Sequence, residues 1–146
     1  MKLCGQDNTE ANRLIESAKE ARALAYTPYS SFTVGAALLT ETGEVYTGCN
    51  IENAAFTPGN CAERTAIFKA VSEGKRDFAA IAIVGGKEGE ELTEGTFCAP
   101  CGVCRQVMME FANPETFRIY LTDGTQVRMY LLKELLPLAF GPKNLE

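Results

Sequence analysis

A helical pattern begins at each of two stretches, Cys61-Ala62-Glu63-Arg64 and Pro100-Cys101-Gly102-Val103-Cys104-Arg105. The first stretch supplies one thiol and one carboxylate, and the second supplies two thiols at the C-x-x-C spacing. The chain contains no histidine, so any soft metal ligands in it must be cysteines. Three thiolates from two segments leave the fourth corner of a zinc ion open, as in a catalytic rather than a structural zinc site.

Length and composition indicate one globular domain over residues 1–146. The chain has 146 residues, 46% of them hydrophobic, and a formal net charge of −5. Its acidic balance argues against a nucleic-acid partner, because phosphate backbones are bound by basic surfaces. No apolar run reaches the length of about 18 residues that a membrane span needs, and residues 1–7 have no signal-peptide character. We therefore expect no membrane association, a cytoplasmic location, and six cysteines that are reduced thiols or metal ligands.

Hydrophobic periodicity predicts helices alternating with strands. Gly35 interrupts one of these strands, which indicates either a bulge or a close approach to the backbone. The order of elements predicts an α/β fold with a mixed sheet. We expect helices over residues 8–26, 61–73, 101–111 and 131–136, and strands over residues 32–40, 45–51, 78–84, 117–121 and 126–130.

The three cysteines have two interpretations. Cys101 and Cys104 are three positions apart, so they lie on one helical face, and Cys61 begins a second helix. Helix N-termini favour the thiolate form, so the ends of two helices are expected to meet at one metal ion. The alternative is that the thiols are buried as small apolar side chains, the commonest state of free cysteine. A second helix start that carries Cys-x-Glu favours the metal site.

Glu63 and Arg64 complete the first stretch. Near the end of the helix, Glu63 and Cys61 can approach the same point, so the carboxyl is a candidate proton shuttle beside a metal-bound water. Otherwise Glu63 is a first-turn acid that only interacts with the helix dipole. Arg64 is a candidate to donate hydrogen bonds to the thiolates and reduce their charge, or it is an exposed helix arginine.

Asn50, Glu52 and Phe32 are weaker candidates. Asn50 and Glu52 alternate along a predicted strand and therefore point to the same side. A paired amide and carboxylate suit two adjacent hydroxyls such as those of ribose, although a solvent-facing strand edge is as good an explanation. Phe32 either belongs to the core or stacks on a planar ring.

Several segments together resemble the small tetrameric cytidine deaminases. The matching segments cover nearly the whole chain beyond its first residues. They are Pro28-Tyr29-Ser30, residues 32–39, Gly48-Cys49-Asn50-Ile51-Glu52-Asn53-Ala54, residues 61–66, residues 100–106, Glu134-Leu135-Leu136-Pro137 and Phe140-Gly141-Pro142.

The resemblance implies a three-layer α/β/α sandwich with a five-stranded mixed sheet, and zinc-dependent hydrolysis of cytidine or deoxycytidine in pyrimidine salvage. Cys61, Cys101 and Cys104 would hold Zn²⁺, with a water or hydroxide in the fourth position that attacks C4 of the base, and Glu63 would transfer protons. Asn50 and Glu52 would bind the ribose, and Phe32 would pack on the base. Backbone groups near Ala54, Ala62 and Ala99 would contact the base edge. Phe140 would reach a neighbouring subunit's site in a homotetramer with shared active sites.

Cys98 leaves other possibilities open. Its spacing to Cys101 and Cys104 matches an iron–sulfur run, with Cys61 as a fourth ligand. A structural zinc site closed by Cys98 or Cys49 is a second alternative, without turnover. Among enzymes, blasticidin deaminase shares the Cys-Ala-Glu and Pro-Cys-x-x-Cys patterns, whereas the segment 50–54 favours a nucleoside. The resemblance assigns no role to Cys98, Cys49, Cys4 or residues 1–7.

Overall fold

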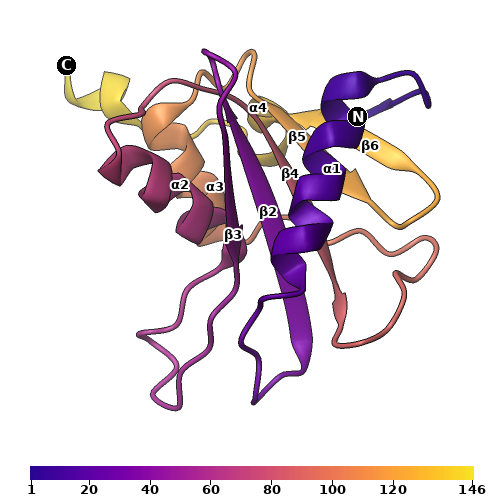
Figure 1. The fold of residues 1–146 in the computed structure, drawn as a ribbon. Helices are drawn as coiled ribbons and strands as arrows, with labels where there is room; N and C mark the ends of the chain where they lie inside the picture. Colours follow the sequence, from indigo (N-terminus) through magenta and orange to yellow (C-terminus); the bar gives the residue numbers. More distant parts are fainter.

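The computed structural model describes residues 1–146, which form one mixed sheet with helices on both faces (Figure 1). The strand order is β1-β6-β5-β4-β2-β3; β4 and β5 are parallel and every other neighbouring pair is antiparallel. The strands are β1 (Lys2–Leu3), β2 (Phe32–Thr40), β3 (Val45–Cys49), β4 (Phe78–Lys87), β5 (Arg118–Thr122) and β6 (Val127–Leu131). The helices are α1 (Thr9–Arg22), α2 (Ala62–Ser72), α3 (Gly102–Phe111), α4 (Leu132–Leu135) and the 3₁₀ helix η1 (Pro142–Leu145).

Strand β4 explains why the sheet needs cover on both faces. Its alternate residues enter two separate cores, since successive strand side chains point to opposite faces. Ile81 and Ile83 belong to the core beneath α2 and α3. Ala80 and Ala82 belong to the core beneath α1. The expected three-layer α/β/α sandwich is therefore confirmed, and the apolar run of β4 is that of a strand buried on both sides.

The sheet has six strands, not the five expected. The additional strand, β1, pairs antiparallel with β6 through Lys2 opposite Met129 and Leu3 opposite Arg128. A strand of two residues is too short to produce a periodic pattern, so the sequence gives no local sign of it.

Helix α1 ends at Arg22, four residues before the end expected at Tyr26. Asn8 caps its start, with Oδ1 accepting a hydrogen bond from the Ala11 backbone N–H. Beyond Arg22, the backbone N–H of Tyr26 donates to Asn50 O, and Tyr26 forms a bridge with Ile51. The segment between Arg22 and Pro28 thus joins α1 to the loop that follows β3. No helix in the fold is both long and apolar enough to cross a membrane.

Gly35 lies in β2 where α1 crosses the sheet. A Cβ at Gly35 would stand 1.9 Å from Ala18 O and 2.5 Å from Arg22 N, so only glycine permits this contact. The sequence left a bulge and a close approach as alternatives, and the structure shows the close approach. The irregularity in the pairing of β2 with β4 lies further along, between Leu39 and Thr40.

Candidate metal centre and adjoining cavity

Two helix N-termini bring three thiols together. Cys61 is the N-cap residue of α2, Cys101 is the N-cap residue of α3, and Cys104 lies in the first turn of α3. The Sγ atoms of Cys61 and Cys101 are 3.9 Å apart, and all three sulfurs lie within 4.8 Å of one another. Two sulfurs that bind one tetrahedral zinc ion at 2.3 Å stand about 3.8 Å apart. The donor set and its spacing therefore fit a zinc ion with one open coordination position.

The ionisation of the Cys61 thiol is favoured by two neighbours, Cys104 and Arg64. The Nη2 atom of Arg64 donates a hydrogen bond to Cys61 Sγ at 3.3 Å. The pKa of Cys61 is lowered to about 5, chiefly by the hydrogen bond from the Cys104 thiol and then by Arg64. The same hydrogen bond to Cys61 and burial raise the pKa of Cys104. A divalent cation is what allows three such close sulfurs to be thiolates together, because it replaces the shared proton.

Glu63 is a buried carboxyl beside this cluster. It lies in the first turn of α2 and is 4% exposed. Burial raises its pKa, and the charge on Cys61 acts in the same direction. A carboxyl with a raised pKa can hold a proton closer to neutral pH than an exposed glutamate can, which suits a proton-transfer role.

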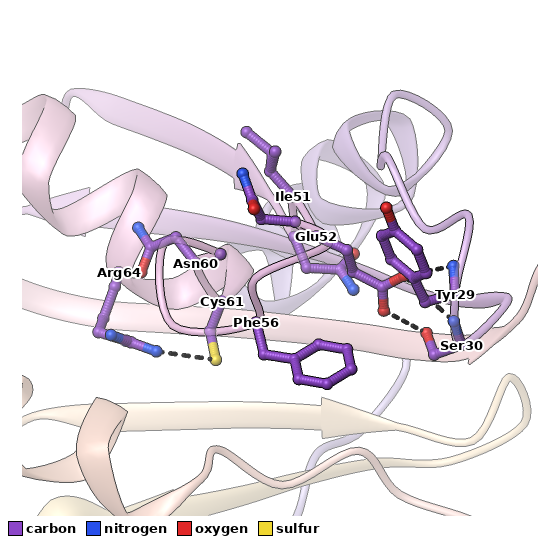
Figure 2. Close-up of a pocket in the computed structure, with 11 residues that line it drawn as sticks. Tyr29, Ser30, Ile51, Glu52, Phe56, Asn60, Cys61 and Arg64 are labelled. Atoms are coloured by element: carbon purple, nitrogen blue, oxygen red, sulfur yellow. Dashed lines mark hydrogen bonds between the residues drawn. The ribbon is translucent and has the colours of Figure 1, made fainter.

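A cavity of about 570 Å³ extends from Cys61 and Arg64 at one end to Tyr29, Ser30 and Glu52 at the other (Figure 2). Its volume lies within the usual range for small-molecule sites. The remaining lining residues come from the loop between β3 and α2: Asn50, Ile51, Asn53, Phe56, Gly59 and Asn60.

Glu52 is held at the far end of the cavity by the turn before β2. Its carboxylate accepts hydrogen bonds from the backbone N–H groups of Tyr29 at 3.0 Å and Ser30 at 3.1 Å, and from the Ser30 hydroxyl. The Ser30 hydroxyl is the main cause of the lowered pKa of Glu52. Asn50 is also fixed, since its Oδ1 accepts from the Val34 N–H at 2.8 Å and its Nδ2 donates to Phe32 O at 2.9 Å.

The structure places some of the other candidate residues outside this cavity. Phe32 is 40% exposed at the start of β2, and Ala54 and Ala99 are exposed in loops. Ala62 is fully buried in the first turn of α2, directly before Glu63. Phe140 is 60% exposed and lines a different cavity, together with Phe68 and Leu145. Asn50, Glu52, Cys61 and Arg64 are therefore the candidates that line one cavity within a single chain.

Sequence reasoning gave no site role to several residues that line the cavity. Tyr29 and Ser30 lie in a segment noted only as part of the family pattern, and their backbone contacts with Glu52 span more than 20 positions. Phe56 is 78% exposed, and its ring packs edge-on against Tyr29 with centroids 6.4 Å apart. The sequence indicated only that Pro28-Tyr29-Ser30 forms a turn, because this segment is typical of one.

Cys98 lies outside the thiol cluster. Its side chain packs against Gly85 of β4, where an added Cβ would stand 2.5 Å from the Cys98 sulfur. Burial raises the pKa of the Cys98 thiol to about 12. Cys49 lies on β3 and is also outside the cluster. The iron–sulfur and closed structural zinc alternatives therefore lack a fourth thiolate ligand.

Comparison with known proteins gives a consistent result. The model of the cytidine and deoxycytidylate deaminase zinc-binding region matches residues 8–120. A cytidine deaminase from Sporosarcina psychrophila is 48% identical over 93% of this chain and 95% of its own length. The crystal structure of cytidine deaminase from Burkholderia pseudomallei superposes with a TM-score of 0.79 at 50% identity, covering 88% of this chain and 98% of the other. A blasticidin-S deaminase from Bacillus cereus is less similar, at 34% identity over 87% of this chain and 89% of its own length.

Proposed function

This chain belongs to the cytidine and deoxycytidylate deaminase family, and on that premise we propose that it hydrolyses cytidine to uridine and ammonia. Deoxycytidine is converted in the same way to deoxyuridine. The observation that carries the proposal is the buried carboxyl of Glu63 beside three clustered thiols, next to a cavity of a size suited to a small molecule.

Zinc is the cofactor, and Cys61, Cys101 and Cys104 hold it as thiolates. When bound, zinc lowers the pKa of a water molecule so that a nucleophile for C4 of the base is available near neutral pH. The Arg64 guanidinium withdraws charge from Cys61 through its hydrogen bond to the sulfur, so that the thiolates do not fully offset the charge of the metal.

Glu63 carries the protons. Glu63 takes a proton from the attacking water, its raised pKa lets the carboxyl hold this proton, and it gives the proton to ring N3 as the water oxygen adds to C4. Glu63 then takes the proton of the added hydroxyl and passes it to the amino nitrogen, so that the C4–N bond breaks and ammonia leaves. One water is consumed, and the carboxyl returns to its starting state.

The proposed sugar contacts rest on residues that line the cavity. The proposed base contacts rest on the family resemblance, because their residues do not line the cavity of a single chain. Asn50 and Glu52 bind the ribose hydroxyls, because both line the cavity, are polar and are held in place by hydrogen bonds. Phe32 packs on the base. The backbone groups near Ala54, Ala62 and Ala99 contact the polar edge of the base.

The active unit is a homotetramer, in which Phe140 reaches the site of a neighbouring subunit. In a single chain Phe140 is largely exposed, beside the exposed side chains of Phe68 and Leu145 and a cavity of about 660 Å³. A contiguous apolar surface of this kind is typical of an interface between protein chains. The site of one chain is then completed by another.

The enzyme acts in the cytoplasm, in pyrimidine salvage. Its six cysteines are all free, and a site made of three thiolates requires a reducing compartment. A nucleoside product that carries an ordinary pyrimidine base is directly reusable for nucleotide synthesis.

Incubation of the purified protein with cytidine, followed by the ultraviolet change to uridine, tests the proposal. We expect turnover that stops when a zinc chelator is added and returns when zinc is supplied. A folded, zinc-loaded protein that leaves cytidine and deoxycytidine unchanged would contradict it. Blasticidin S in a parallel reaction tests the antibiotic substrate of the Bacillus cereus relative.

A further inference from the structure

We infer that Ser30 is a positioning residue for substrate binding: it directs the Glu52 carboxylate so that its Oε2 atom accepts a sugar hydroxyl of the substrate. The inference rests on the proposed function, in which Glu52 binds the ribose, and it adds a residue and an acceptor atom to that site.

The two oxygens of Glu52 are used unequally. Oε1 accepts two backbone hydrogen bonds, from Tyr29 N at 3.0 Å and from Ser30 N at 3.1 Å. Oε2 accepts one hydrogen bond, from the hydroxyl of Ser30 at 2.5 Å. An ionised carboxylate has about four acceptor positions, two on each oxygen. Both positions on Oε1 are thus occupied, and the free position is on Oε2.

The Ser30 hydroxyl is itself oriented by the backbone. Its Oγ atom accepts a hydrogen bond from the Phe32 N–H at 3.0 Å. Because that donor occupies one side of the oxygen, the hydroxyl hydrogen is directed toward Glu52 Oε2. The chain of contacts from the Phe32 N–H through Ser30 to Glu52 therefore fixes the carboxylate in one orientation at the cavity end. Figure 2 shows the contact between Ser30 and Glu52.

Of the three hydrogen bonds that the turn donates to the Glu52 carboxylate, only the one from the Ser30 hydroxyl comes from a side chain and can be removed by substitution. Asn50, another polar residue that lines the cavity, is hydrogen-bonded to the backbone of Val34 and Phe32 rather than to a side chain. Removing the Ser30 hydroxyl consequently releases one oxygen of Glu52 and leaves the contacts of Asn50 intact. Ser30 is exposed, so the substitution leaves no cavity in the core.

The test compares two competitive inhibitors of cytidine turnover, uridine and 2′,3′-dideoxyuridine, in the wild type and in Ser30→Ala. Uridine carries the sugar hydroxyls and dideoxyuridine lacks both. We expect the inhibition constant of uridine to rise about tenfold in Ser30→Ala, as for loss of a hydrogen bond to a charged group, and that of dideoxyuridine to change less than about twofold. The double variant with Glu52→Gln should bind uridine no more weakly than Glu52→Gln alone, because Ser30 acts through Glu52.

Controls separate positioning from a merely structural role. Ser30→Thr keeps the hydroxyl and should retain wild-type affinity for uridine. Ser72→Ala removes another exposed hydroxyl, which bonds Lys69 O at the other end of α2, and should change neither inhibition constant. If Ser30→Ala does not fold, Ser30→Cys replaces the strong donor by a weak one and allows the same comparison.

Equal weakening of both inhibitors, or additive effects of Ser30→Ala and Glu52→Gln, would overturn the inference. So would an unchanged affinity for uridine in folded Ser30→Ala. Turnover of cytidine by the wild-type enzyme tests the proposed function separately. If the wild type is active and any of these three results is found, only the role of Ser30 is refuted. An inactive, zinc-loaded wild type would refute both the role of Ser30 and the proposed function.

Discussion

Cys98 and Cys101 are three positions apart and have different surroundings. Cys101 lies in the cluster of three thiols, whereas Cys98 packs against Gly85 outside it. The structure therefore separates a thiol of the cluster from a packed thiol, although both cysteines belong to one C-x-x-C-x-x-C run. This distinction decides between a zinc site with an open position and a four-cysteine cluster.

The paired substitutions Cys101→Ser and Cys98→Ser test this distinction. Cys101→Ser replaces a soft thiolate ligand and should weaken zinc binding by at least about 100-fold, more than the loss of an outer-shell contact. Cys98→Ser should keep its zinc. Metal content after gel filtration, with chelator competition for affinity, measures both. A Cys101→Ser protein that is fully loaded and active would refute the ligand assignment.

The grouping of the three thiols was predictable from sequence, but the contacts that support the adjoining cavity were not. The three thiols and Glu63 stand at helix starts, which local spacing indicates. Ser30 and Glu52 are 22 positions apart, and their contact forms only when the turn before β2 meets the loop after β3. A single sequence contains no local pattern for such a pair, so the role of Ser30 required the structure.

Among the elements, the crossing of α1 over β2 depends on Gly35. We expect Gly35→Ala to lower the free energy of unfolding by about 3 kcal/mol, since the added methyl meets backbone atoms that cannot rotate away. Urea denaturation measures the change. Gly102→Ala is the matched control, because a Cβ there meets nothing within 4 Å. Equal stability of Gly35→Ala and the wild type would show that α1 and β2 can separate at little cost.

Asp123 links the loop after β4 to the turn between β5 and β6. Backbone N–H groups of Gln126, Gly95 and Thr125 hold the pKa of this carboxyl well below its usual range. Because its pKa is lower in the folded than in the unfolded chain, the carboxylate stabilises the fold at neutral pH. This contribution is lost as the pH falls below about 4 toward the folded-state value.

Asp123→Asn should therefore lower the melting temperature more at pH 7 than at pH 3. Calorimetry of the wild type and the variant at both pH values measures this difference. Glu94→Gln, an exposed change on the loop that Asp123 contacts, is the control and should have little effect at either pH. A destabilisation by Asp123→Asn that is equal or larger at pH 3 would contradict the role of the carboxylate.

Element prediction succeeded where burial imposes a clear pattern. Strand β4 is apolar on both faces, and both of its sides are covered in the fold. The end of α1 was predicted too late because the backbone of Tyr26 bonds to Asn50, a contact invisible to helical periodicity. The two-residue strand β1 was missed because its only support is pairing with β6, more than 120 positions away.

In the proposed tetramer, the exposed apolar surface around Phe140 would make activity depend on assembly. Truncation before Phe140 should reduce kcat/KM for cytidine by about 10-fold or more, as for removal of an aromatic group that helps enclose a substrate. Steady-state kinetics together with sedimentation measure activity and assembly separately. Unchanged kinetics in the truncated protein would exclude a pocket role for Phe140.

Mixed oligomers provide the control for that prediction. Chains truncated before Phe140 and Glu63→Gln chains should each have low activity. Co-expression should restore part of it, because some sites then combine an intact Glu63 with an intact Phe140 from another subunit. No recovery in oligomers shown to contain both chains would argue that each site is complete within one chain.

Cytidine turnover by Glu63→Gln at known zinc content tests whether the buried carboxyl beside the thiols carries the protons of the reaction. The variant retains Cys61, Cys101 and Cys104, so we predict wild-type zinc content. It lacks a carboxyl that can carry a proton, so kcat should fall by about 1,000-fold, within the range attributed to general acid–base catalysis. Wild-type turnover by the zinc-loaded variant would contradict the account, because it would leave the buried carboxyl beside the thiols without a part in the reaction.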